Sequence, residues 1–270
     1  MNYHKFSNTD FFFDHEENAG KVNEGVVTHY HNLFEIYYLS EGKCTYFIDN
    51  KAYNLVPGDL ILIPSGVIHN TRYKDDNHSR ILINCSQKYI PSSIRPIFPS
   101  IIYLYRNPEV NDEILKILRI IESEYNNPDK MTDEILTCYS HALFFLLARN
   151  KNTCKEIKST LAFIQKAIEY LQENFRNEIS LNEVAKNLNI SVEHLSRTFK
   201  KETGCGFNNY LTLLRLKESV TLLKQTNYSI SEIATMCGFS DGNYFSSLFK
   251  KYHGISPKAY SKAPPSEHKK

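Results

Sequence analysis

Two histidines and a glutamate lie within seven positions of one another in the segment THYHNLFEIYYLSEG, residues 28–42. His29, His31 and Glu35 share parity with Tyr37, so on one unbroken β-strand all four side chains would point to the same face. An inward face that carries imidazoles, a carboxylate and a phenol is typical of a pocket wall rather than of a dry core. The segment therefore predicts either a metal site or the lining of a ligand pocket.

The surrounding chain, residues 25–85, alternates short apolar segments with turn residues. The segments are VVTHYH, FEIYYLSEG, KCTYFIDNKAYNLVPGD, LILIPSG and RILINCS. Many short strands at this spacing predict a β-sandwich or a β-barrel.

The spacing of the polar residues resembles that of the cupin barrel. Two motifs carry the resemblance: His29-x-His31-x3-Glu35-x6-Gly42, and Gly58-x5-Pro64-x-Gly66-x2-His69. The second motif is incomplete, because Tyr73 stands where cupins have asparagine. In metal-binding cupins the positions that match His29, His31, Glu35 and His69 hold a transition metal. Three imidazoles and a carboxylate suit Fe, Mn, Zn, Cu or Ni.

Three interpretations of these side chains stay open on the sequence. The histidines could satisfy buried hydrogen bonds and do nothing else. A second interpretation is a metal-free effector pocket lined by five side chains: His29, His31, Glu35, Tyr37 and His69. The third is a divalent transition metal on His29, His31, Glu35 and His69; otherwise no cofactor is expected.

A repeat occupies the last third of the chain. Residues 180–210 and 229–260 match at a spacing of 49, changing to 50 after a one-residue slip. Each copy begins with Ser-x-x-Glu, which predicts a capping box at the start of a short helix. A second helix, over about 191–202 or 241–252, would bury one stripe at i, i+4 spacing: Leu195 and Phe199, or Phe245 and Phe249. Two short crossed helices joined by a tight turn form a helix-turn-helix.

Residues 207–225 lie between the copies and predict one amphipathic helix, roughly 28 Å long at 1.5 Å per residue. This length approaches the ~34 Å of one turn of B-DNA, so a reading helix at each end could enter successive major grooves. A plain helical bundle is the alternative. The local charge argues against it, because residues 155–270 carry 17 Lys and Arg against 11 Asp and Glu.

The segments ISLNEVAKNLNISVEHLSRTFKKETG, RLKESVTLL and GISPKAY resemble the DNA-binding domain of AraC/XylS-type transcription regulators. The resemblance covers roughly residues 155–262 and implies that both helix-turn-helix units dock on DNA. The matching base-contacting positions are Glu193, Ser196, Arg197, Gly242, Asn243, Ser246 and Ser247. The family usually has arginine or lysine at Ser247 and often a bulkier polar residue at Gly242, so the second unit is expected to read fewer bases.

These side chains differ in how much base discrimination they could provide. Arg197 could bind guanine O6 and N7, and Asn243 could bind adenine N6 and N7, each discriminating by about 1–3 kcal/mol. Glu193 could accept from cytosine N4 or cap its helix. The lysine pairs are expected to meet phosphates, which sets affinity but not sequence preference: Lys200, Lys201, Lys250 and Lys251.

Residues 109–150 predict two helices. The first has a stripe of Ile114, Ile117, Leu118 and Ile121. The second has a stripe of Ile135, Cys138, Tyr139 and Ala142. In the similar regulators this segment carries dimerisation, so either the barrel or a second copy of the chain would cover these stripes.

The whole chain predicts an α+β protein of two domains. The expected parts are a cupin-like effector-binding barrel over 1–108, a helical linker over 109–154, a double helix-turn-helix domain over 155–263 and a tail over 264–270. The apolar fraction of 41% and the absence of a long apolar run or a secretory leader predict a cytoplasmic protein without a membrane partner.

The resulting hypothesis is a transcription regulator, expected to be an activator and a homodimer, that contacts double-stranded DNA and RNA polymerase. It would respond to a small effector, with a sugar implied by the resemblance. The alternative is a metal-dependent cupin enzyme with an appended DNA-binding module; the regulator itself would not be an enzyme.

Overall fold

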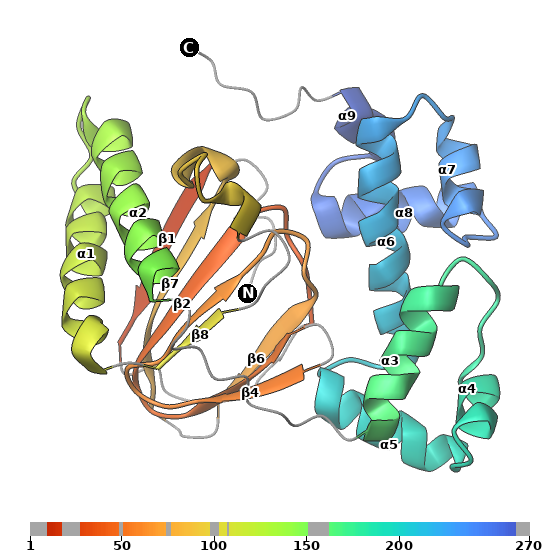
Figure 1. The fold of residues 1–270 in the computed structure, drawn as a ribbon. Coiled ribbons are helices and arrows are strands. Elements are labelled where there is room, and N and C mark those ends of the chain that lie inside the picture. The colour runs from red at the N-terminus through yellow and green to blue at the C-terminus, as the bar shows by residue number, and fades with distance from the viewer. Residues whose placement is uncertain are drawn as a thin grey trace. The chain divides into compact units, whose positions relative to one another are not determined.

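The computed structural model describes residues 10–17, 28–48, 51–73, 77–97, 103–106, 108–150 and 162–262. The chain divides into two compact units, one of residues 9–159 and one that contains residues 160–270 (Figure 1). The first is built on β-sheets and the second is helical. The predicted two-domain α+β class is therefore confirmed. The predicted junction at 154/155 and the tail over 264–270 lie outside the described residues.

Among the described residues of the first unit, eight strands form two antiparallel sheets. One sheet has the order β1-β7-β2-β5-β8 and the other the order β4-β3-β6. The strands are β1 (Phe11–Glu16), β2 (Phe34–Glu41), β3 (Cys44–Ile48), β4 (Lys51–Leu55), β5 (Leu60–Ile63), β6 (His69–Tyr73), β7 (Ser79–Cys85) and β8 (Tyr103–Tyr105). The 3-10 turns η2 (Gln87–Tyr89) and η3 (Arg95–Ile97) follow β7.

Strand β2 sends alternate side chains into two different cores. Ile36 and Tyr38 belong to the core that the large sheet shares with two helices. Tyr37 and Leu39 belong to the core between the two sheets. The parity predicted for this strand is thus confirmed, and the odd-numbered positions of β2 face the barrel interior.

The predicted strand VVTHYH differs from the structure in its described part. His29 makes an isolated antiparallel bridge with His69, and the chain bends at Asn32 and Leu33 before β2 begins. The histidines and Glu35 therefore do not share one strand, although they remain on one side of the barrel. Residues 26 and 27 lie outside the described residues.

Helices α1 (Pro108–Asn126) and α2 (Thr132–Arg149) pack on the outer face of the large sheet (Figure 1). The predicted stripe of α1 is right, because Ile114, Leu118 and Ile121 are buried. The predicted stripe of α2 is wrong. The buried side chains are Leu136, Ser140, Leu143, Phe144 and Leu147, whereas Cys138 and Ala142 are exposed. Helix α2 is apolar on two faces, and the face predicted to be buried is the one turned partly to solvent.

Over residues 162–262, the described part of the second unit, the chain forms seven helices: α3 (Ala162–Asn174), α4 (Leu181–Asn187), α5 (Val192–Thr203), α6 (Phe207–Gln225), α7 (Ile230–Met236), α8 (Gly242–His253) and α9 (Pro257–Lys262). The pairs α4–α5 and α7–α8 are the two predicted helix-turn-helix units, and α6 joins them. The predicted stripes are confirmed, because Leu195, Phe199, Phe245 and Phe249 are fully buried.

The two turns repeat the same backbone geometry. Asn189 and Gly238, 49 positions apart, both adopt a positive φ, of 54° and 84°. A Cβ on Gly238 would lie 2.7 Å from the carbonyl oxygen of Arg176, so this position requires glycine. The sequence repeat is therefore a repeat of structure as well.

The predicted capping boxes are half right. In the second copy Ser229 and Glu232 satisfy each other's backbone N–H groups. In the first copy Ser180 accepts from the N–H of Glu183, but the Glu183 carboxylate accepts instead from the hydroxyl of Tyr170, at 2.6 Å. Tyr170 on α3, 13 positions earlier in the chain, thus replaces the backbone N–H of Ser180 as the donor to this carboxylate.

Candidate functional site

The reading helices α5 and α8 begin with side-chain caps. Ser191 accepts from the backbone N–H of His194 at 3.2 Å. Asp241 accepts from the N–H groups of Asn243 and Tyr244, at 2.7 and 2.8 Å. Because unpaired N–H groups at a helix start need acceptors, these caps fix where each reading helix begins.

The predicted base-contacting side chains lie along one side of each reading helix, opposite the buried stripe. Five of them are exposed: Glu193, Ser196, Arg197, Asn243 and Ser247. Gly242 and Ser246 are half-buried, so the second helix offers less polar surface than the first. A Cβ added at Gly242 would approach only Ser231 Oγ, at 3.8 Å, so a larger residue would fit there.

The four lysines predicted to meet phosphates are exposed in the last turns of the same helices. Each helix then ends at a glycine with a φ of 77°, Gly204 after α5 and Gly254 after α8. The two helices therefore present the same order of features: an oxygen cap, a polar middle and a basic end.

Tyr244 was not predicted as a contact residue. It lies in the first turn of α8 beside Asn243, and 58% of it is exposed. The sequence offers a signal for it, because Tyr244 stands where the first copy has His194, 50 positions earlier and also exposed.

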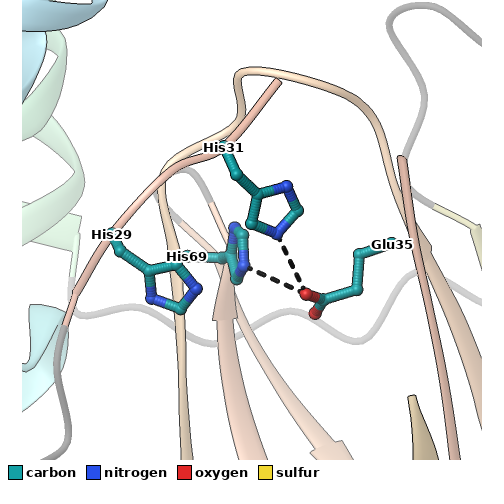
Figure 2. Close-up of side chains that lie close together, drawn as sticks. All are labelled: His29, His31, Glu35 and His69. Atoms are coloured by element: carbon teal, nitrogen blue, oxygen red, sulfur yellow. Dashed lines mark hydrogen bonds and ion pairs between the residues drawn. The ribbon is translucent and has the colours of Figure 1, made fainter. Parts of the chain in front are cut away.

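In the barrel, His29, His31, Glu35 and His69 come together (Figure 2). One ligand atom from each lies within 4.8 Å of the others. We call these four residues the quartet. Glu35 Oε2 lies 3.1 Å from His31 Nε2 and 3.5 Å from His69 Nε2. Glu35 and His69 are buried, while His29 and His31 are half-buried.

Backbone carbonyls set the orientation of two imidazoles. His31 Nδ1 donates to the carbonyl oxygen of Leu33 at 3.0 Å, and His69 Nδ1 donates to that of Val67 at 2.8 Å. Because a carbonyl oxygen only accepts, each Nδ1 carries the proton and each Nε2 faces Glu35. The 3.5 Å from His69 Nε2 to Glu35 is an ion-pair distance rather than a good hydrogen bond, and this buried nitrogen has no hydrogen-bond partner among the described residues.

Glu35 and His69 stabilise each other's charged forms. Burial alone would raise the pKa of Glu35, but His69 and His31 outweigh it and hold the pKa well below its ordinary value. Burial alone would lower the pKa of His69, but Glu35 raises it. Tyr46, which the sequence did not single out, donates to Glu35 Oε1 at 2.5 Å. The carboxylate is therefore ionised and held on both oxygens.

These side chains fit a divalent transition metal. Two ligands bound to one ion at about 2.1 Å lie roughly 3.0–3.4 Å apart, close to the separations around Glu35 Oε2. Metal-bound histidines commonly donate their second nitrogen to a backbone carbonyl, as His31 and His69 do. An ion here would be held by the quartet and would supply a Lewis-acidic centre for an oxygen ligand.

Tyr37, the fifth predicted pocket residue, lies deeper in the interior. Its hydroxyl donates to that of Tyr73 at 3.2 Å and lies 3.8 Å from Cys44 Sγ. Its ring meets Tyr46 edge-on, with centroids 4.9 Å apart. Tyr37 thus adjoins the quartet through Tyr46 and does not contact the ligand atoms themselves in any interaction described here.

Across the described residues, every helix is too short or too polar to span a bilayer.

Comparison with known proteins finds two matching families. The AraC-like ligand binding domain matches residues 18–136, and a helix-turn-helix domain matches residues 184–263. The HTH-type transcriptional activator RhaR of Mannheimia succiniciproducens is 28% identical, with 86% of each chain covered. The HTH-type transcriptional activator RhaS of Escherichia coli is 24% identical, with 85% of each chain covered. The C-terminal domain of AraT from Geobacillus stearothermophilus is 33% identical over 42% of this chain and 98% of its own, with a TM-score of 0.37.

The helix-turn-helix domain makes DNA a partner of this protein, and the ligand-binding domain makes a small molecule its effector. The family matches favour a transcription regulator over the cupin enzyme. With a sensor barrel followed by two helix-turn-helix units, the chain belongs to the AraC/XylS family of transcription regulators.

Proposed function

We propose that this protein is a cytoplasmic transcription activator whose barrel binds a small polar metabolite, a sugar in particular. One observation carries the proposal: the helices on either side of α6, α5 and α8, each begin at a side-chain oxygen cap, continue with polar residues and end with two lysines. The relatives named as transcriptional activators support activation, which also makes RNA polymerase a partner.

The spacing of the reading helices determines the expected DNA site. Helix α6 has 19 residues and is about 28 Å long, so α5 and α8 would enter neighbouring major grooves on one side of the duplex. Arg197 and Asn243 would contact base edges, and the four lysines would contact phosphates.

Effector control requires that the effector bind one arrangement of the protein better than another. We propose that the active arrangement is a homodimer formed through the helices α1 and α2. Ile120, Cys138, Ala142 and Phe145 are exposed on these helices and would offer an apolar surface to a second copy. Sedimentation of the wild type and of Phe145→Asp tests this contact, because the variant should lose the dimer and keep its fold.

Selection of bound sequences from a random duplex library, with and without a panel of sugars, tests the regulator. The selected site should contain two short boxes about 10–10.5 base pairs apart. A protein that selects no sequence at low ionic strength would contradict the proposal.

The four possible metal ligands of the quartet also fit a second function, that of a metal-dependent enzyme. Metal analysis of the purified protein, followed by assays for turnover of small substrates, separates the two. Stoichiometric metal together with turnover would favour the enzyme.

A further inference from the structure

Strand β7 buries a polar side chain, that of Asn84, in the first unit. Asn84 on β7 has 0% of its surface exposed. Both its amide nitrogen Nδ2 and its oxygen Oδ1 have no hydrogen-bond partner among the described residues.

The position of Asn84 on β7 places its side chain inside the barrel. Its neighbours Ile83 and Cys85 face the helix-covered core, and Leu82 faces the core between the sheets. Because side chains alternate along a strand, Asn84 points inward like Leu82. It stands directly opposite Glu35 in the antiparallel pairing of β7 with β2, which puts their Cβ atoms roughly 5 Å apart.

A buried amide without partners costs free energy. On burial the amide loses its hydrogen bonds to water and gains none in return, whereas an apolar residue of similar size would carry no such penalty. His69 Nε2, in the same part of the interior, is likewise buried and lacks a hydrogen-bond partner among the described residues. His69 Nε2 still lies within ion-pair distance of Glu35, whereas the Asn84 amide makes no hydrogen bond among the described residues, so Asn84 is the polar group that a bound molecule could satisfy.

We propose that Asn84 and the quartet form a single effector site. A divalent transition-metal ion on the quartet would bind one oxygen of the effector, and the Asn84 amide would hydrogen-bond to the adjacent oxygen. An amide both donates and accepts, so it pairs with a hydroxyl through either role. The effector class is therefore a small molecule with vicinal hydroxyls, such as a sugar. This inference rests on the proposed sensing role and names the chemistry of that site.

The first test is metal binding. The protein is stripped with a chelator, reloaded with Co(II), and its metal content and visible absorption are measured. One Co(II) per chain with an absorption spectrum typical of nitrogen ligands is expected, and His69→Ala should lose both. His31→Gln provides a second variant if His69→Ala does not fold. Wild-type protein that retains no Co(II) after gel filtration would overturn the proposal.

The second test is the effector. Pentoses and hexoses are added to the Co(II)-loaded protein, and a change in the absorption spectrum together with a rise in Tm is expected for at least one of them. Asn84→Leu should keep its Co(II) and its Tm but lose at least tenfold in affinity for that sugar. Asn70→Leu is the matched control, because Asn70 is also a buried asparagine in the barrel but is bonded to Thr28 at 3.3 Å. The control should lower Tm and retain the sugar response.

Three results would overturn the inference: no sugar perturbs the Co(II) spectrum, Asn84→Leu binds sugar like the wild type, or Asn84→Leu loses stability as Asn70→Leu does. These failures are separate from a failure of the regulator. If DNA binding still depends on sugar in metal-free Asn84→Leu protein, the proposed effector site is wrong, but the proposal of a transcription regulator is not contradicted.

Discussion

Tyr46 on β3 donates a hydrogen bond of 2.5 Å to Glu35 on β2, and both side chains are buried between the two sheets of the barrel. The bond joins the three-stranded sheet to the five-stranded one at the quartet. Because a buried carboxylate is costly unless its oxygens are paired, this phenol supports the ionised state of Glu35.

We expect Tyr46→Phe to destabilise the barrel. The substitution leaves Glu35 Oε1 without the phenolic donor, which should lower the free energy of unfolding by about 1–3 kcal/mol. Urea titration followed by circular dichroism measures the loss. Tyr37→Phe is the control, because the Tyr37 hydroxyl bonds only neutral groups in the interactions described here and its removal should cost less. An equal loss in the two variants would contradict the role given to Tyr46.

Arg197 and Lys250 should affect DNA binding differently. Arg197→Ala should relax specificity by about 1–3 kcal/mol, because it removes a bidentate donor from the base-contacting face. Lys250→Ala should weaken binding to all duplexes alike and reduce the slope of log affinity against log salt by about one. Fluorescence anisotropy on a selected site and on a random duplex, over a range of salt concentrations, measures both. Equal losses on the two duplexes for Arg197→Ala would count against its assignment.

Tyr244 should contribute to affinity without contributing to stability. The residue is 58% exposed in the first turn of α8, so Tyr244→Ala should change the free energy of unfolding by no more than about 0.5 kcal/mol. Affinity for the selected duplex should fall by roughly tenfold, as expected for one lost contact. Tyr228→Ala is the control, because Tyr228 is 50% exposed but lies outside the reading helices. Unchanged affinity for Tyr244→Ala would show that this side chain does not face DNA.

Much of the helical unit could be predicted because its sequence signals are short-range and occur in both copies of the repeat. Caps at Ser180 and Ser229, stripes of Leu195 and Phe199, and glycines after each reading helix follow from short-range rules. The exception is Glu183, whose carboxylate bonds Tyr170 on another helix. Periodicity within one segment carries no information about such a partner.

In the barrel, several strands and the motif residues Glu35 and His69 could be predicted, but the pairing of the strands could not. The parity of β2 correctly placed Glu35 and Tyr37 inside, but Tyr46 and Asn84 reach the same interior from other strands, through pairings that the sequence does not show. The buried face of helix α2 was predicted wrongly for another reason. The helix is apolar on two faces, so the pattern could not decide whether Leu143 or Ala142 faces the sheet.

The helical unit should lose stability in mild acid through His253. This residue ends α8 and packs against the rings of Phe249 and Tyr260, with centroid distances of 4.3 and 5.6 Å. Burial lowers the pKa of His253 to about 4, below the value near 6.5 expected in the unfolded chain. The unfolded state therefore takes up the proton first as pH falls, so the stability contributed by neutral His253 is complete above pH 6.5 and declines towards pH 4. At pH 5 the free energy of unfolding should be lower by about 2 kcal/mol than at pH 7.5 from this group alone.

Urea titrations at the two pH values, on wild type and on His253→Phe, measure the difference. The His253→Phe variant should lose this part of the pH dependence. The control His194→Gln, at an exposed position, should retain it. A variant with the full wild-type dependence would place the acid sensitivity elsewhere in the chain.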